Sequence, residues 1–236
     1  GSILVKVPAG EFEMGDGKEG NCPKHRVYLD EYYIGVYCIT NRQYKRFVDE
    51  TGHRPPDHSD YSQAAPIWKG KGYPKEKADH PVVCVSWDDA VAYCAWAGLR
   101  LPTEAQWEKG ARGPGGYVYP WGNEWDGAKC RYGGNRGGET TSEVYGYPEG
   151  VSGYGCYNMS GNVWEWCRDW YDDGYYKGSP RKNPENTKKG SYRVLRGGGW
   201  GNDGAERFRG AYRVYSGPSI RGGDSGLRAV LPRVQQ

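Results

Sequence analysis

From residue 113 onward the sequence alternates glycine with large aromatic rings, and this pattern leaves hardly any stretch that could form a long helix. Hydrophobic residues make up only 36% of the 236 residues, so the 21 tyrosines and 10 tryptophans must supply much of the apolar area. The 38 glycines leave room for tight turns and closely packed rings. We therefore predict a loop-rich, mixed architecture in one domain over residues 1–236.

The charge balance excludes several classes of protein. The net charge is +3 with both signs interspersed, which lacks the basic face of a nucleic-acid binder. No apolar run approaches the ~18 residues of a membrane span. The Gly1-Ser2 start is typical of an expression remnant, so a removed leader stays an option, and the compartment leans toward the cell surface or secretion. The oligomeric state stays open.

The seven cysteines show no C-x-x-C spacing, which argues against a zinc ribbon. We expect them to be scattered core thiols, with one or two disulfides as the alternative.

Three segments carry the capping pattern that starts a helix. The first begins at Thr40 or Asn41, the second at Ser86, and the third at Thr103, ending near residues 110–113. Asp89 and Gln106 stand three residues after their caps, where their side chains can return a hydrogen bond. The expected apolar faces are Tyr44, Phe47 and Val48 on the first helix and Val91, Cys94 and Ala95 on the second.

Short strand signals lie at both ends of the chain. We predict two strands within residues 3–15, broken at Pro8, a further pair at 26–29 and 32–37, and a buried strand at 82–85. Residues 158–166 and 226–230 also have the pattern of strands, whereas 52–81 are predicted to be a long loop.

Four motifs occur in a fixed order along the chain. They are Leu99-Arg-Leu-Pro-Thr-Glu-Ala-Gln-Trp-Glu108, Tyr119-Pro-Trp-Gly122, Gly161-Asn-Val-Trp-Glu-Trp166 and Leu195-Arg-Gly-Gly-Gly-Trp200. With these motifs the chain, from its first strand to Val230, resembles the sulfatase-modifying-factor family, which contains the formylglycine-generating enzyme. The resemblance implies an α+β, C-type lectin-like fold, irregular, with two main helices and several small antiparallel sheets.

The resemblance also implies what the chain lacks. The family's oxidase is copper-dependent and uses a pair of cysteines just after the glycine-rich motif, but no cysteine follows Cys167 here. Cu(I) needs soft thiolate ligands, so we expect no copper and no oxidase activity. Iron-dependent relatives take histidine ligands from an additional helical domain. The four histidines of this chain are His25, His53, His58 and His80, and because their spacing is not that of metal ligands we expect no iron.

One metal site of the family is retained in this sequence. The family's calcium loop corresponds to Asn158, Gly161, Val163 and Glu165, where side-chain and main-chain oxygens would hold a structural Ca²⁺. The alternative is that Asn158 and Glu165 only form hydrogen bonds within turns.

The polar segment after the glycine triplet also resembles the variable proteins of diversity-generating retroelements. Positions that are often asparagine in related non-enzymatic proteins carry other residues here, each reachable from an asparagine codon by changes at adenine. Tyrosines there would give contact area, and Ser, Gly and Asp adaptable hydrogen bonds. Within the candidate segment 200–226, the predicted ligand-binding residues are Trp200, Gly201, Asn202, Asp203, Tyr212, Val214, Tyr215, Ser216, Gly217, Ile220, Gly222, Gly223 and Asp224.

Our first hypothesis is therefore a non-catalytic protein that binds a protein or other macromolecular ligand through residues 200–226. The alternatives are an oxidoreductase of the formylglycine-generating type or another enzyme of the family, and a pure assembly module. The segment could also be a tolerant surface loop. Its arginines Arg207, Arg209 and Arg213 could pair internally with acidic residues instead of contacting a ligand.

Overall fold

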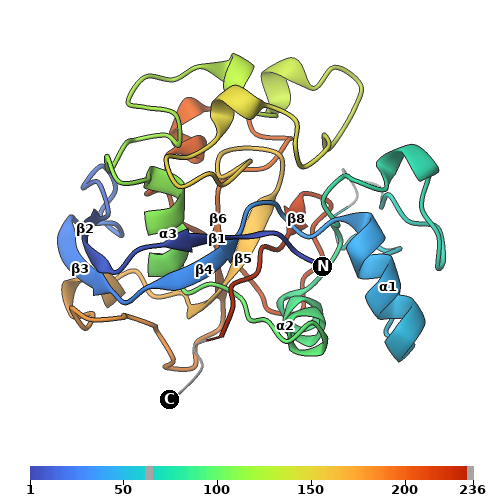
Figure 1. The fold of residues 1–236 in the computed structure, drawn as a ribbon, viewed down its shortest axis with the longest axis horizontal. Coiled ribbons are helices and arrows are strands. Elements are labelled where there is room, and N and C mark those ends of the chain that lie inside the picture. Colours follow the sequence, from blue (N-terminus) through green and yellow to red (C-terminus); the bar gives the residue numbers. More distant parts are fainter. Residues whose placement is uncertain (62–65, 233–236) are drawn as a thin grey trace.

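The computed structural model describes residues 1–61 and 66–232, so residues 62–65 of the predicted loop lie outside the described part. The strands are β1 (Leu4–Val7), β2 (Gly10–Met14), β3 (His25–Leu29), β4 (Tyr32–Gly35), β5 (Trp164–Trp170), β6 (Arg193–Arg196), β7 (Val214–Ser216) and β8 (Ser225–Gly226). The α-helices are α1 (Asn41–Thr51), α2 (Trp87–Trp96) and α3 (Glu104–Arg112) (Figure 1). Short 3-10 helices lie in the loops: η1 (Lys75–Lys77), η2 (Gly127–Lys129), η3 (Gly133–Asn135), η4 (Pro148–Gly150), η5 (Tyr175–Lys177) and η6 (Ala205–Phe208).

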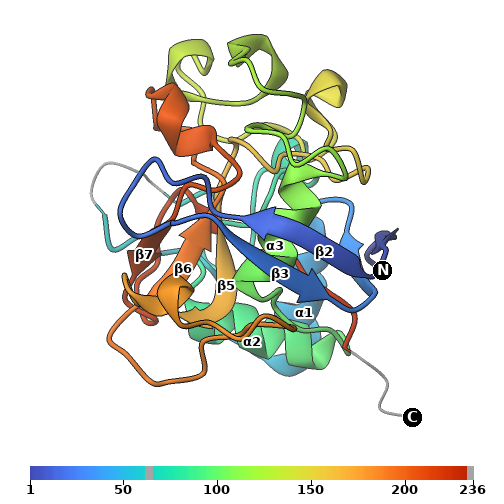
Figure 2. The same ribbon diagram turned by 90° about the vertical axis from the view of Figure 1, so that its left-hand side faces the viewer.

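The strands form three small sheets. A four-stranded sheet has the order β7-β6-β5-β8, in which only the pairing of β5 with β8 is parallel. The predicted strands near the N-terminus are present, but β1 pairs with β4 and β2 with β3, so one ribbon encloses the other along the chain. In Figure 2 the β2–β3 ribbon crosses in front of α3. The predicted α+β fold class is confirmed.

All three helices predicted from cap signals are present, one more than the two main helices that the resemblance implied. The capping boxes expected at Ser86 and Thr103 are confirmed, and Thr40 forms a third one with Gln43. Helix α3 is buried along its whole length and lies between the sheets. The face predicted for α2 is wrong in part, because Val91 and Ala95 are exposed. The buried positions follow from the cap instead: Asp89 turns inward and places Ala90, Tyr93 and Cys94 on the core side.

Two predicted strands differ from the structure. Residues 82–85 are buried as expected, but Cys84 has a positive φ of 61°, which breaks an extended run. Residues 158–163 form turns, with Asn158 and Asn162 at φ 54° and 67°, and strand β5 begins only at Trp164. Of residues 226–230, Gly226 ends β8 and Val230 forms isolated bridges.

Tryptophan rings fill much of the core. Trp107 and Trp166 are fully buried, and Trp164 and Trp200 are each 6% exposed, while Trp87 and Trp121 are half-buried. All seven cysteines are free and buried, as predicted for core thiols. In the part of the chain that the structure describes, no helix is long and apolar enough to cross a membrane.

Candidate functional site

A buried network of charges fixes the glycine-rich motif and the following segment to α3. Arg196 donates to Glu104 over 2.8 Å and to Glu108 over 2.6 Å, and all three side chains are nearly inaccessible. Arg213 donates to both oxygens of Glu104, over 2.7 and 2.9 Å. Burial alone would raise the pKa of Glu104, but Arg213 and Arg196 hold this pKa below its ordinary value. Glu104 therefore remains ionised and anchors two arginines.

A second anchor of the segment is Arg209, which lies four residues before Arg213. Arg209 forms ion pairs with Asp16 and Glu19 of the loop between β2 and β3, and its side chain is 2% exposed. Internal pairing is thus confirmed for Arg209 and Arg213, whereas Arg207 is exposed. These arginines brace the segment.

The backbone between the two anchors is also held. The Gly210 carbonyl accepts a hydrogen bond from Arg196 Nη2 over 2.5 Å, and the Gly210 amide donates to the Val118 carbonyl. A Cβ at position 210 would lie 2.6 Å from Cγ of Arg112, so only glycine fits there. Residues 209–213 therefore have a fixed path that does not depend on the predicted ligand-binding side chains.

The predicted ligand-binding residues differ widely in exposure. Trp200, Gly222 and Gly223 are buried, so the prediction that these three residues belong to an accessible binding surface is wrong. The Trp200 indole donates to the Gly223 carbonyl over 3.1 Å, and the Gly222 carbonyl accepts from the Cys84 amide. The exposed residues are Gly201, Asp203 and Tyr215, and the half-buried ones are Asn202, Tyr212, Val214, Ser216, Gly217, Ile220 and Asp224.

The structure does not bring these residues onto one surface. The ring of Tyr212 lies 6.3 Å from that of Trp164 and packs on the α2 side of the sheet. Tyr215 lies on the other face, where its ring centroid is 4.3 Å from Tyr171 and 4.7 Å from Tyr192. The reason is that successive side chains of an extended chain point to opposite faces. Because Arg213 is buried on one face, Tyr215 lies on that same face and Tyr212 on the other.

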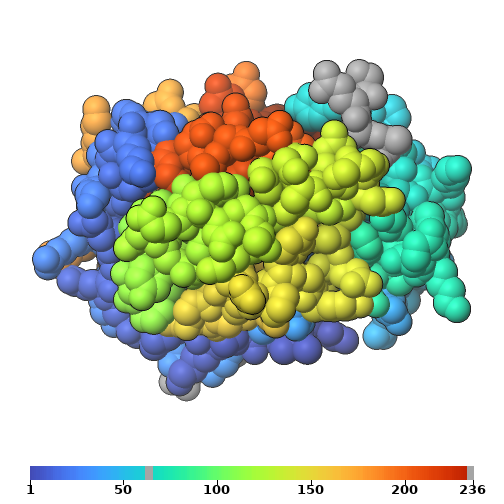
Figure 3. Space-filling view, turned by 90° about the horizontal axis from the view of Figure 1, so that it is seen from above, coloured from blue at the N-terminus to red at the C-terminus, as the bar shows by residue number. Residues whose placement is uncertain are grey.

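Apart from the surfaces around Tyr212 and Tyr215, a third group of predicted ligand-binding residues comprises Gly201, Asn202 and Asp203. It lies at the end of the molecule that is formed by the long irregular loops. The Asn202 carbonyl accepts from the Gly133 amide over 2.7 Å, and Asn202 Oδ1 accepts from the Gly199 amide over 2.9 Å. In Figure 3 the orange segment that contains η6 lies between the blue N-terminal loop and the green loops. Asn202 thus shapes the turn after the glycine triplet, and Gly201 and Asp203 are its accessible members.

The predicted calcium loop is only partly suited to a cation. Both oxygens of Glu165 accept hydrogen bonds, Oε2 from Trp107 over 2.7 Å and both from Arg228 over 2.8 and 2.9 Å. Cys38 Sγ lies 3.0 Å from Oε1 as a further donor. Asn158 Oδ1, in contrast, is buried without a hydrogen-bond partner among the described residues. Glu165 therefore serves as the counter-charge of Arg228, and Asn158 is the side chain that fits an ion.

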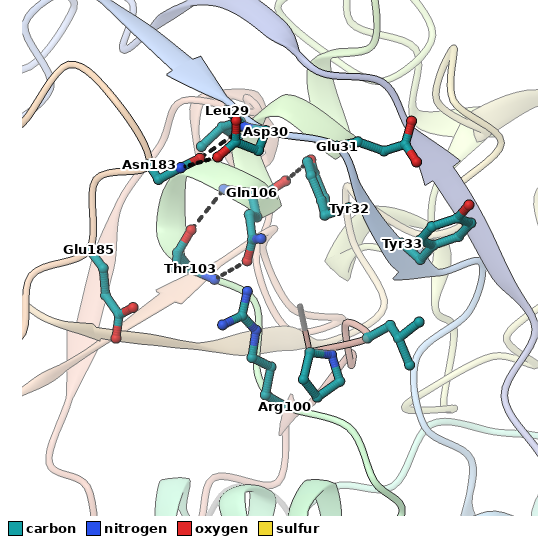
Figure 4. Close-up of a pocket in the computed structure, with 12 residues that line it drawn as sticks. Leu29, Asp30, Glu31, Tyr32, Tyr33, Arg100, Thr103, Gln106, Asn183 and Glu185 are labelled. Atoms are coloured by element: carbon teal, nitrogen blue, oxygen red, sulfur yellow. Dashed lines mark hydrogen bonds between the residues drawn. The ribbon is translucent and has the colours of Figure 1, made fainter. Parts of the chain in front are cut away.

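The sequence did not indicate a cavity of about 330 Å³ near the start of α3, shown in Figure 4. Two of its acidic side chains already have basic partners, because Glu31 pairs with Lys6 over 3.1 Å and Glu185 with Arg168 over 2.8 Å. No residue of the segment 200–226 lines it.

The mixed and irregular α+β architecture, with three α-helices and small sheets, is that of a C-type lectin-like protein. Residues 2–232 match the model of the sulfatase-modifying factor enzyme 1-like domain, and the chain belongs to this family. It is 35% identical to the formylglycine-generating enzyme of Streptomyces coelicolor, over 96% of this chain and 88% of the relative. It is 32% identical to the inactive C-alpha-formylglycine-generating enzyme 2 of Bos taurus, over 84% and 76% of the two chains.

Two solved structures have the same fold. PvdO from Pseudomonas aeruginosa superposes with a TM-score of 0.84 at 29% identity, covering 96% of this chain and 93% of its own. Treponema denticola variable protein 1 superposes with a TM-score of 0.78 at 25% identity, covering 96% and 94%. The similar proteins thus include ones named as enzymes, one named inactive and one named a variable protein.

Proposed function

We propose that this protein is a non-catalytic binding protein that presents the accessible part of residues 200–226 to a protein or other macromolecular ligand. One observation carries the proposal: the segment contains no cysteine, and every cysteine of the chain is at most 1% exposed. A copper oxidase of this family would need a pair of thiolates just after the glycine-rich motif, because Cu(I) needs soft ligands. The likeness to a variable protein supports the same function.

The state of the cysteines adds a chemical argument. Burial raises the pKa of the Cys84, Cys94 and Cys130 thiols to about 12, and it also holds the pKa of Cys38 and Cys167 well above the ordinary value of a thiol. The thiolate is the form that binds metals, and these groups remain protonated at neutral pH.

The frame suits recognition because it is fixed before a ligand arrives. Arg209 and Arg213 hold the backbone between them through buried ion pairs, so binding need not order this part of the chain. Tyr215 is 50% exposed and rests on two further tyrosines, which offers a rigid aromatic contact. We further propose that the segment is diversified. A reverse transcriptase gene beside the coding sequence would separate this from a merely tolerant surface loop.

The proposal is tested by the combined change Tyr212→Ala, Tyr215→Ala and Asp224→Asn. Proteins from the native host that the wild type retains on an affinity column should be lost with this variant, and the Kd for each, remeasured by calorimetry, should rise at least tenfold. The matched control is Tyr117→Ala, Tyr145→Ala and Glu124→Gln, which changes exposed residues outside the segment. We expect the control to bind like the wild type.

Two outcomes would contradict the proposal. One is unchanged binding of every captured ligand by the folded triple variant. The other is stoichiometric copper together with oxidation of a cysteine-containing peptide by the wild type. The second result would favour the oxidoreductase, the alternative that the likeness to the Streptomyces coelicolor enzyme supports.

We also propose a calcium brace at Asn158, but a weak one. With Glu165 paired to Arg228, the available ligands are neutral oxygens of Asn158, Gly161 and Val163, and calcium affinity falls with ligand charge. We expect a Kd on the order of 10⁻⁴ to 10⁻³ M. The Tm of EDTA-dialysed protein should therefore rise during a CaCl₂ titration only in that range, and not with MgCl₂.

The calcium control is Asn158→Gly, because glycine tolerates the positive φ of 54° while removing the side-chain oxygen. This variant should lose the calcium-dependent rise in Tm. A wild-type Tm that does not change during the CaCl₂ titration would refute the calcium site. A Tm increase that is already complete at micromolar calcium would refute the proposal that all its ligands are neutral.

A further inference from the structure

A carboxylate lies beside aromatic rings where the segment 200–226 returns to the sheet. A Cβ on Gly199 would lie 3.0 Å from Cδ1 of Trp164 and 3.1 Å from both Cβ and Oδ2 of Asp224, so the missing side chain lets the indole and the carboxyl group approach each other. The Asp224 carbonyl accepts from the Trp164 amide over 2.8 Å, and Tyr212 packs on the same indole. Asp224 and Tyr212 thus both lie against Trp164, and the three residues are called here the aspartate–aromatic site.

The carboxylate of this site has one hydrogen-bonded oxygen and one without a partner. Asp224 Oδ1 accepts from Ser225 Oγ over 3.2 Å, while no hydrogen bond to Oδ2 is found within residues 1–61 and 66–232. No lysine, arginine or histidine in that part of the chain forms an ion pair with Asp224. Burial raises the pKa of Asp224, opposed only by the Ser225 hydroxyl and the backbone.

Two arginines in or beside the segment, Arg209 and Arg221, are already held by other acids. Arg209 lies 5.7 Å from the Tyr212 ring but is fastened to Asp16 and Glu19. Arg221, three residues before Asp224, pairs with Asp60 over 3.2 Å. Within residues 1–61 and 66–232, Asp224 thus has no cationic partner, which leaves its negative charge for a group from outside the chain.

We propose that the aspartate–aromatic site binds a cationic group of the ligand, an ammonium or a guanidinium, with Asp224 as its counter-charge and the Tyr212 ring as its apolar wall. The inference rests on the proposed function, because it names the chemistry that one part of the segment recognises. A half-buried carboxylate gains a charge-assisted hydrogen bond when a cation arrives, and an aromatic face attracts the same cation.

The test uses small probes. We would titrate the protein with N-acetyl-lysine methylamide and with its uncharged analogue N-acetyl-norleucine methylamide, and follow the Trp164 and Trp200 indole N–H signals by NMR. The lysine probe should shift the Trp164 signal saturably and the norleucine probe should not. Asp224→Asn should weaken lysine binding by about tenfold or more, whereas Glu124→Gln, which removes an exposed charge outside the segment, should leave it unchanged.

The pH profile separates binding from a structural role. Because the pKa of Asp224 is raised above 3.8, lysine binding should weaken as the pH falls through that raised value, and Asp224→Asn should abolish this dependence. The Tm of Asp224→Asn should equal or exceed that of the wild type, because the amide avoids a buried charge.

Equal shifts with both probes, or unchanged lysine binding by Asp224→Asn, would overturn the inference. If the triple variant nevertheless loses its macromolecular ligand, the proposed function stands without this site. If the lysine probe behaves as expected while no macromolecule depends on the segment, the site stands and the proposed function fails.

Discussion

Replacing Arg196 by methionine is expected to lower the free energy of unfolding by about 3–5 kcal/mol. The guanidinium of Arg196 is fully buried and neutralises Glu104 and Glu108 at once, so its loss leaves excess negative charge in the core. It also removes the donor to the Gly210 carbonyl. Urea unfolding followed by tryptophan fluorescence measures the difference.

The matched control is Arg181→Met. Arg181 pairs with Glu11 at the surface, with side chains 66% and 43% exposed, and such pairs contribute less than about 1 kcal/mol. If Arg196→Met does not fold, Glu108→Gln tests the same network with a side chain of equal size. A loss below about 1 kcal/mol in either variant would show that the network does not hold α3 to the sheet.

The second large effect is on pH dependence, where two buried groups oppose each other. Burial and Glu104 raise the pKa of Asp169 from 3.8 to about 7, so between these values the folded state binds more protons than the unfolded chain and stability falls as pH rises. Burial and Lys77 lower the pKa of His80 from 6.5 to about 4, so its contribution falls as pH decreases through that window. The two slopes have opposite signs between about pH 4 and 6.5.

His80→Gln removes the pH dependence of stability that comes from His80 and should leave the one that comes from Asp169. We expect the variant to gain stability as the pH is lowered from 7 to 5, by up to about 1.4 kcal/mol per pH unit, while the wild type changes little. Urea unfolding at pH 5, 6 and 7 measures both profiles. Carboxylates with a lowered pKa, such as Glu104, titrate below this range. Parallel profiles of variant and wild type would show that His80 does not offset Asp169.

Local signals in the sequence predicted the parts of the fold that are decided locally. The capping boxes at Thr40, Ser86 and Thr103 identify the helices because the bonds join residues three apart. Pairing of β5 with β8 in parallel could not be predicted, since β8 is only Ser225–Gly226 and its position depends on the whole chain. The positive φ of Cys84 has no local signal either, because glycine or asparagine is the usual residue there.

The candidate site was predictable as a segment but not as a surface. The sequence shows that residues 200–226 are polar and free of cysteine, and these properties need no coordinates. Which side chains are accessible depends on distant partners: Arg213 turns inward because Glu104 lies there, and this places Tyr215 opposite Tyr212. Likewise, the engagement of Glu165 follows from Arg228, which is 63 residues away in the sequence.

The separation of Tyr212 from Tyr215 by the edge of the sheet has a consequence for selection. A substitution at 215 reshapes a contact with Tyr171 and Tyr192 and leaves the indole of Trp164 untouched, whereas a substitution at 212 does the reverse. The two positions can thus be tuned independently, and one molecule could engage different partners from its two sides at the same time. A single partner that contacts both tyrosines must have a concave surface that reaches around the β7 strand to both faces of the sheet.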